Sequence, residues 1–154
     1  GNYGSDYKYH HVYLGNNSRL DEMQAAFLAA KLPHLDRMNI ARRRIAGLYL
    51  EGIRNPLVTL PYVPEYAQPV WHIFAIRCGR RAELEKFLND AGIGTNKHYP
   101  IPMHLQPCYQ NLGFRQGDFP IAEEISATQL SLPMYYGMTE EQIQYVIGKV
   151  NEFR

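Results

Sequence analysis

The sequence lacks the features that would place the protein in a membrane, in an oxidising compartment or on nucleic acid. Its apolar runs are far shorter than the roughly 20 residues that a membrane-spanning helix needs. Two cysteines, Cys78 and Cys108, in 154 residues do not form a disulfide framework, so we expect reduced thiols in a cytoplasmic protein. Sixteen Lys and Arg against fifteen Asp and Glu leave no basic excess for DNA. We therefore expect neither membrane nor nucleic acid as a partner.

Several enzyme motifs are also missing. The chain has no P-loop, no G-x-G-x-x-G fingerprint and no nucleophile elbow around a serine. The candidate metal ligands are His98, His104 and Cys108, but their spacing matches no closed zinc pattern and no fourth ligand accompanies them. We therefore expect no metal site.

The pattern that is present predicts a small mixed α/β domain. Ser18 with Asp21, and Thr139 with Gln142, have capping-box spacing ahead of helical apolar periods. Pro33 interrupts the first period, and the opening residues 1–15 show no helical period and read as a loop. The predicted helices cover residues 20–30, 35–52 and 81–91, and two further helices are predicted to begin at Pro120 and Thr139. The predicted strands cover residues 70–78 and 93–98. Strand 70–78 has apolar residues on both faces, so we expect it to be central in a mostly antiparallel sheet of about three strands, an α+β sandwich.

The densest group of polar side chains lies over residues 97–106. Lys97, His98, Tyr99 and His104 follow a predicted strand on a proline-stiffened loop, where two imidazoles, a phenol and an ammonium could contact a polar ligand. Packing of these side chains within the loop is the alternative, and the residues alone leave it open.

A second group, Tyr7 to His11 with Asn17, Ser18 and Arg19, precedes the first predicted helix. Free backbone N–H groups at a helix N-terminus, flanked by Lys8 and Arg19, suit a phosphate. Ser18 could instead only cap the helix and Arg19 only pair with a carboxylate. The glutamates at the predicted helix starts and on solvated faces are given no acid or base role: Glu22, Glu123, Glu124, Glu140 and Glu141.

Three segments in order carry a family resemblance: GNNSRLDEMQAAFLAAKLPHLDRMNIARR, HYPIPMHLQPCYQNLG and FPIAEEISATQLSLPMYYGMTEEQI. They resemble the DegT/DnrJ/EryC1/StrS sugar aminotransferases, which are enzymes dependent on pyridoxal 5′-phosphate (PLP), and together they span nearly the whole chain. The opening NYGSDYKYHH is most similar to members acting on dTDP-linked keto-deoxysugars, the dTDP-3-amino-3,6-dideoxyhexose branch. The family often has Trp where this chain has Met38, a packing difference.

The resemblance implies the small C-terminal domain of a PLP-dependent transferase of fold type I. Residues 1–18 would be a loop arriving from a large domain, and residues 19–154 the small domain with its leading helices. The family's cofactor-binding lysine lies upstream of the segment that matches Asn2 to Gly4. The resemblance therefore implies that this chain alone is inactive and binds no PLP covalently, because a transaminase needs that amine.

The resemblance also implies roles for individual residues in the intact homodimer. Asn17, and more weakly Arg19, would reach the PLP phosphate of the other subunit. Lys8 and Tyr9 would border the neighbouring active site near the nucleotide diphosphate. The substrate-facing loop would carry His98 and Tyr99, with His104 behind them, orienting the keto-sugar. The amino donor would be glutamate, and dimer contacts would come from the helical N-terminal part.

Two alternatives stay open. Some relatives are PLP-dependent sugar dehydratases in which histidine replaces the lysine, and that position lies upstream of this chain. A non-catalytic binding or dimerisation module of the same fold is the other alternative. In each case the apolar side of the helix over 20–30 has no cover within the chain, so we expect dimers, higher oligomers or poor order at the N-terminus.

Overall fold

The computed structural model describes residues 5–7, 10–11, 18 and 20–154. The chain divides into two compact units, residues 1–37 and 38–154. The predicted boundary between residues 18 and 19 stays a prediction. None of the described helices is long and apolar enough to cross a bilayer.

The first unit contains a pair of short antiparallel strands, β1 (Ser5–Tyr7) and β2 (His10–His11). The expectation of a plain loop over residues 1–15 was wrong here, because alternation of tyrosine with polar residues also has the period of a strand. Helix α1 (Glu22–Lys31) follows and ends ahead of Pro33 as predicted. The 3-10 turn η1 (Leu32–His34) then leads into α2 (Leu35–Gly52).

The second unit is built on a three-stranded antiparallel sheet with the order β3-β4-β5. Its strands are β3 (Val58–Thr59), β4 (Phe74–Cys78) and β5 (Gln129–Leu132). Strand β4 is central and pairs with β5 so that Phe74 lies opposite Leu132 and Arg77 opposite Gln129. The predicted three-stranded sheet with a central strand in 70–78 is therefore confirmed.

Two strand boundaries differ from the predictions. Trp71 has φ 53°, a left-handed conformation that breaks an extended run, so β4 begins only at Phe74. The predicted strand over 93–98 was wrong, since it contributes a single bridge between Asn96 and Ser131. Strand β5, which the sequence analysis missed, supplies the third strand, and its four residues are all buried.

The remaining helices begin where their sequence signals predict. They are α3 (Arg81–Asp90), α4 (Pro120–Thr128) and α5 (Glu140–Glu152). Thr139 and Gln142 form the predicted capping box at the start of α5. Between α3 and α4 the chain makes two 3-10 segments, η2 (Met103–Leu105) and η3 (Pro107–Leu112).

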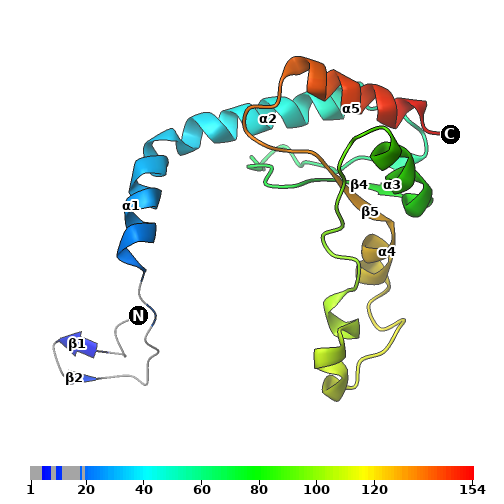
Figure 1. The fold of residues 1–154 in the computed structure, drawn as a ribbon. Coiled ribbons are helices and arrows are strands. Elements are labelled where there is room, and N and C mark those ends of the chain that lie inside the picture. The colour runs from blue at the N-terminus through cyan, green and yellow to red at the C-terminus, as the bar shows by residue number, and fades with distance from the viewer. Residues whose placement is uncertain (1–4, 8–9, 12–17, 19) are drawn as a thin grey trace. The chain divides into compact units, whose positions relative to one another are not determined.

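Helices cover both faces of this sheet. Alternate β4 residues Phe74, Ile76 and Cys78 are buried and face a core drawn from α2, α3 and α5. Figure 1 shows α2 and α5 side by side there, joined by the bond from the Asn151 amide to the Gly52 carbonyl, 2.9 Å. On the other face α4 contacts β4, and its Glu124 pairs with Arg77 at 3.2 Å. The segment between Asn96 and Pro120 leaves the sheet beside α4 (Figure 1).

Candidate functional site

Four of the predicted site residues lie outside the described residues: Lys8, Tyr9, Asn17 and Arg19. Their expected roles at a phosphate and a nucleotide diphosphate stay predictions.

The helix start beside them is described, and it differs from the expectation. Asp21, not Ser18, is the N-cap of α1, and its Oδ1 accepts from the N–H groups of Met23 and Gln24 at 3.0 and 3.1 Å. Two of the backbone N–H groups expected to be free for an anion are therefore taken by a carboxylate of this chain.

The ring and backbone of His98 make three hydrogen bonds, two of them to side chains of strand β5. Its N–H donates to Gln129 Oε1 at 2.9 Å, and its Nδ1 lies 2.9 Å from Ser131 Oγ. Nε2 lies 3.2 Å from the Asn96 amide nitrogen. Gln129 and Ser131 are both buried, and the Gln129 amide donates to Ser131 Oγ at 2.6 Å. The imidazole therefore stands in a fixed orientation.

This network forms one wall of a pocket of about 310 Å³. The pocket lies between the segment before β4, the segment after Gly94 and the end of β5. Its lining carries amide, hydroxyl and imidazole groups beside small apolar surfaces: His72, Ile73, Gly94, Thr95, Asn96, His98, Ser131, Leu132, Pro133 and Met134. Such a donor and acceptor set suits a polar organic ligand.

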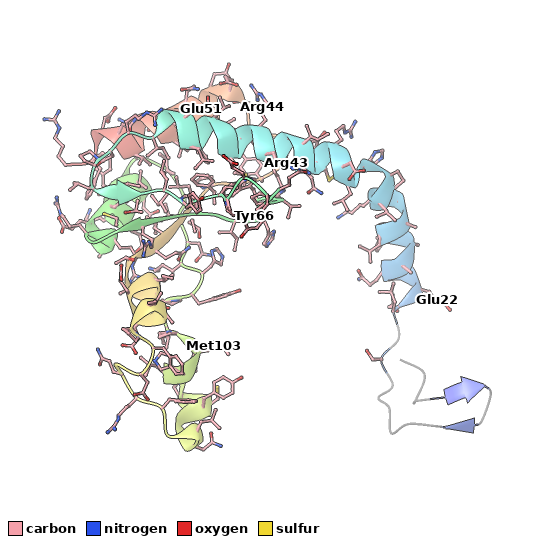
Figure 2. All side chains as sticks on the ribbon, turned by 180° about the vertical axis from the view of Figure 1, so that it is seen from behind. Glu22, Arg43, Arg44, Glu51, Tyr66 and Met103 are labelled. Atoms are coloured by element: carbon pink, nitrogen blue, oxygen red, sulfur yellow. The ribbon has the colours of Figure 1, made fainter. Side chains whose placement is uncertain are left out.

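Tyr99 follows His98 in the loop and is 71% exposed. Its ring meets His98 edge-on at 5.6 Å between centroids, and the peptide bond between the two residues is cis. Tyr99 also borders a larger, mainly apolar groove of about 750 Å³ formed by residues 99–104 and α4. Met103 stands on this segment (Figure 2). Tyr99 thus lines the apolar groove, next in the chain to His98 of the polar pocket.

His104 lies behind this loop and is bound to α4. Its side chain is 8% exposed and its Nε2 lies 3.0 Å from Glu123 Oε1. The ring packs edge-on against Phe119 at 4.8 Å between centroids. This contact fastens the 3-10 segment to the helix that covers the sheet. Glu123, which lies at a helix start as predicted, serves as the anchor.

Two residues on one face of helix α2 hydrogen-bond the segments before β4 and after β5, which form the other walls of the polar pocket. Arg42 Nη1 donates to the carbonyls of Trp71 and Met134, each at 3.1 Å, and also lies 3.4 Å from the His72 carbonyl. Two turns later, the Tyr49 hydroxyl donates to the Pro133 carbonyl at 2.9 Å. The chain entering β4 and the chain leaving β5 are therefore tied to the same helix.

Sequence reasoning singled out His98, Tyr99 and His104 as candidates but missed most of the residues that contact them. Asn96, Gln129 and Ser131 carry no recognisable motif and meet only through sheet pairing. One available signal was the run Gln129 to Leu132, whose glutamine and serine stand among apolar residues between a helix and a proline. Read as a buried strand, that run would have placed two polar side chains inside the domain, where they need partners.

The described lysines and acids set limits on the chemistry here. Lys86, Lys97 and Lys149 each pair with a carboxylate, and Lys97 has both Glu85 oxygens within 2.9 Å. Within the described part of the chain, no three His, Cys, Asp or Glu side chains are grouped to hold a metal ion.

The fold and the site together define a small α/β domain with a polar, aromatic loop beside a pocket. The family model of the DegT/DnrJ/EryC1/StrS aminotransferases matches residues 1–151. The chain belongs to this family.

The chain is also similar to individual members of the family. It is 47% identical over 98% of its length to a pleiotropic regulatory protein of Geobacillus stearothermophilus. It is 43% identical over 99% to a dTDP-3-amino-3,6-dideoxy-α-D-galactopyranose transaminase of Aneurinibacillus thermoaerophilus. Each alignment covers 41% of the relative, so the chain spans about two fifths of their length. Streptomyces venezuelae DesV, solved with a ketimine intermediate, superposes with a TM-score of 0.92 at 44% identity, over 98% of this chain and 41% of that one.

Proposed function

We propose that this chain is the C-terminal part of a PLP-dependent aminotransferase acting on a nucleotide-linked keto-sugar, a dTDP-keto-deoxyhexose. The observation that carries the proposal is the family match, which runs through the chain from end to end while covering two fifths of the relatives. In the intact enzyme the chain would supply loops that contact substrate and cofactor, and dimer contacts through its helical N-terminal part. Glutamate is the proposed amino donor.

The residues of the chain fit an assisting role toward the cofactor. When bound, PLP supplies the electron sink that allows an amino group to move between carbon atoms. The polar pocket offers hydrogen-bonding groups, and three of the described lysines are held in ion pairs. That the lysine binding PLP covalently lies outside this chain is supported by the family resemblance, in which that lysine precedes the segment matching Asn2 to Gly4. Asn17 and Arg19 would contact the cofactor phosphate, and Lys8 and Tyr9 the nucleotide.

For the substrate, the exposed Tyr99 phenol and the fixed His98 ring would orient the keto-sugar. His104, bound to Glu123, would support the loop from behind. The loop residues thus select and orient, and proton transfer in the main step belongs to the lysine.

The test is a steady-state assay of the full-length protein with keto-sugar and glutamate. Tyr99→Phe and His98→Ala should each raise KM for the sugar by about tenfold, the loss of one hydrogen bond of about 1.4 kcal/mol, with KM for glutamate unchanged. The matched control is Tyr66→Phe, at an exposed tyrosine (Figure 2) that lines neither the polar pocket nor the apolar groove. Asn17→Ala should weaken PLP binding.

Several results would overturn the proposal. Full-length protein with bound PLP that aminates no nucleotide keto-sugar would do so, and dehydration of the sugar in place of amination would establish the alternative chemistry. The 154-residue chain alone, freed of unbound PLP by gel filtration and then treated with borohydride, should carry no stoichiometric adduct at one lysine. Such a stoichiometric adduct at a single lysine would show that the chain carries its own cofactor lysine.

A further inference from the structure

The hydrogen bonds around His98 fix which of its ring nitrogens carries the proton. Two backbone N–H groups, which can only donate, set the amide orientations first. The N–H of Lys97 donates to Asn96 Oδ1 at 2.8 Å, and the N–H of His98 donates to Gln129 Oε1 at 2.9 Å. The amide nitrogens of Asn96 and Gln129, both donors, must therefore point at the remaining partners.

Those amide nitrogens decide the rest of the network. Asn96 Nδ2 faces His98 Nε2 at 3.2 Å, so Nε2 must accept and, in the neutral ring, the proton lies on Nδ1. The Nδ1–H group then donates to Ser131 Oγ at 2.9 Å, which also accepts from the Gln129 amide at 2.6 Å. The opposite tautomer would set an Nε2–H group against an amide N–H group, two donors facing each other.

Backbone pairing holds the arrangement rigid. Asn96 and Ser131 exchange two backbone hydrogen bonds of 3.2 and 2.7 Å, and the buried Gln129 lies two residues away on β5. Asn96 itself is exposed at the rim of the polar pocket. A ligand hydroxyl entering the pocket could thus take the place of the Asn96 amide at Nε2, whereas the buried Ser131 stays at Nδ1.

We propose that Asn96 is a positioning residue that holds His98 in the Nδ1–H form, so that the ring meets the ligand as a hydrogen-bond acceptor. The ligand group at this point is then a donor, a hydroxyl of the keto-sugar, and not a diphosphate oxygen. This assignment of the ligand group rests on the proposed function; the tautomer does not. Neutral imidazole has one donor and one acceptor nitrogen. Which nitrogen carries the proton therefore decides whether the ring binds a hydroxyl, which donates, or a diphosphate oxygen, which accepts.

Asn96→Asp tests the assignment with almost no change of shape. The new carboxylate still accepts from the Lys97 N–H, but toward His98 it can only accept, so Nε2 must now carry a proton. Asn111→Asp, on the exposed part of η3, adds the same charge away from the pocket and is the control.

The direct readout is the nitrogen NMR spectrum of full-length protein containing ring-¹⁵N histidine, at about pH 8, where an ordinary imidazole is neutral. His98→Gln identifies the signals. Wild type and N111D should show an unprotonated Nε2 and a protonated Nδ1 at His98, and N96D a protonated Nε2. A protonated Nε2 in the wild type, or no change in N96D, would overturn the inference.

The kinetic readout separates the sugar from the diphosphate. N96D should lower kcat/KM for the keto-sugar by about tenfold, one hydrogen bond of about 1.4 kcal/mol, while inhibition by dTDP alone changes less than about twofold. Equal loss of dTDP binding, or an unchanged kcat/KM, would show that His98 does not accept from a sugar hydroxyl. If the wild type aminates no keto-sugar, the proposed function fails, while the nitrogen spectrum still decides the tautomer.

Discussion

Among single residues, Glu123 gathers three donors on one carboxylate oxygen. Oε1 accepts from the Gly117 N–H at 2.8 Å and more weakly from the Phe119 N–H at 3.4 Å, and it meets His104 at 3.0 Å. Desolvation raises the pKa of the Glu123 carboxyl, but these bonds together lower it below its ordinary value of 4.5. The segment from residue 104 to 119 is thus tied to α4 through one ionised group.

We predict that Glu123→Gln lowers the melting temperature at neutral pH. Because the folded-state pKa is lowered, the contribution of Glu123 is fully present above about 4.5 and is lost as pH falls through the folded value. The difference in melting temperature between wild type and E123Q should therefore shrink below about pH 4.5. Thermal melts across pH check this, with Glu124→Gln, an exposed neighbour, as control. A difference independent of pH would contradict it.

Tyr49 is a second residue whose substitution should lower the stability of the domain. Its ring is buried, and burial, followed by the nearby Tyr135, raises the pKa of its phenol. We predict that Tyr49→Phe destabilises the domain by about 1–3 kcal/mol, because the Pro133 carbonyl loses its donor in the interior. Urea unfolding measures this. Tyr145→Phe, whose exposed hydroxyl also bonds a carbonyl, should cost less, since water can replace it.

At the scale of elements, helix α2 offers a matched pair of glycines. An alanine Cβ at Gly47 meets no atom within 4 Å, whereas at Gly52 it would lie 2.9 Å from Cδ1 and 3.0 Å from Cγ2 of the buried Ile147. The same chemical change is therefore expected to have opposite consequences at two positions five residues apart.

We predict that Gly47→Ala stabilises the protein by about 0.5–1 kcal/mol through helix propensity. Gly52→Ala should destabilise it by about 1–3 kcal/mol, because α2 and α5 must separate or Ile147 must leave its rotamer. Urea unfolding of both variants gives the comparison. Equal effects of the two substitutions would show that the close approach of α2 and α5 is not rigid.

Elements with their own local signals could be predicted, and those defined by distant partners could not. The capping box of α5 and the proline at the start of α4 are encoded within a few residues, and both helices begin there. Strand β5 has only four residues, and its identity depends on pairing with β4, far away in the chain. The segment 93–98 has strand-like composition, but only Asn96 finds a partner. His98 and Tyr99 could be singled out for the same local reason, whereas Asn96, Gln129 and Ser131 needed the fold.

Helix α1 has no buried residue. Leu20, Met23, Phe27 and Leu28 are each more than half exposed. A ten-residue helix is marginal in water without packing, so this apolar surface needs cover from outside the described part of the chain.

We predict that the 154-residue chain self-associates at micromolar concentrations, and that Met23→Glu with Phe27→Glu prevents this by placing charge on the apolar surface. Sedimentation velocity across a concentration series measures it. Gln24→Glu, on the same exposed helix, adds charge without removing apolar area and is the control. A wild-type chain that stays monomeric, with α1 fully helical, would contradict the prediction.

The hydrogen bonds from Arg42 to three backbone carbonyls have a practical consequence for redesign of the polar pocket. A guanidinium that recognises main-chain oxygens makes no demand on the side chains at positions 72 and 134, although both contribute to the lining of the pocket. The path of the chain and the chemistry of its lining are thus specified by separate residues. A library randomised at His72 would therefore change the lining of the pocket, while the bond from Arg42 to the His72 carbonyl is kept.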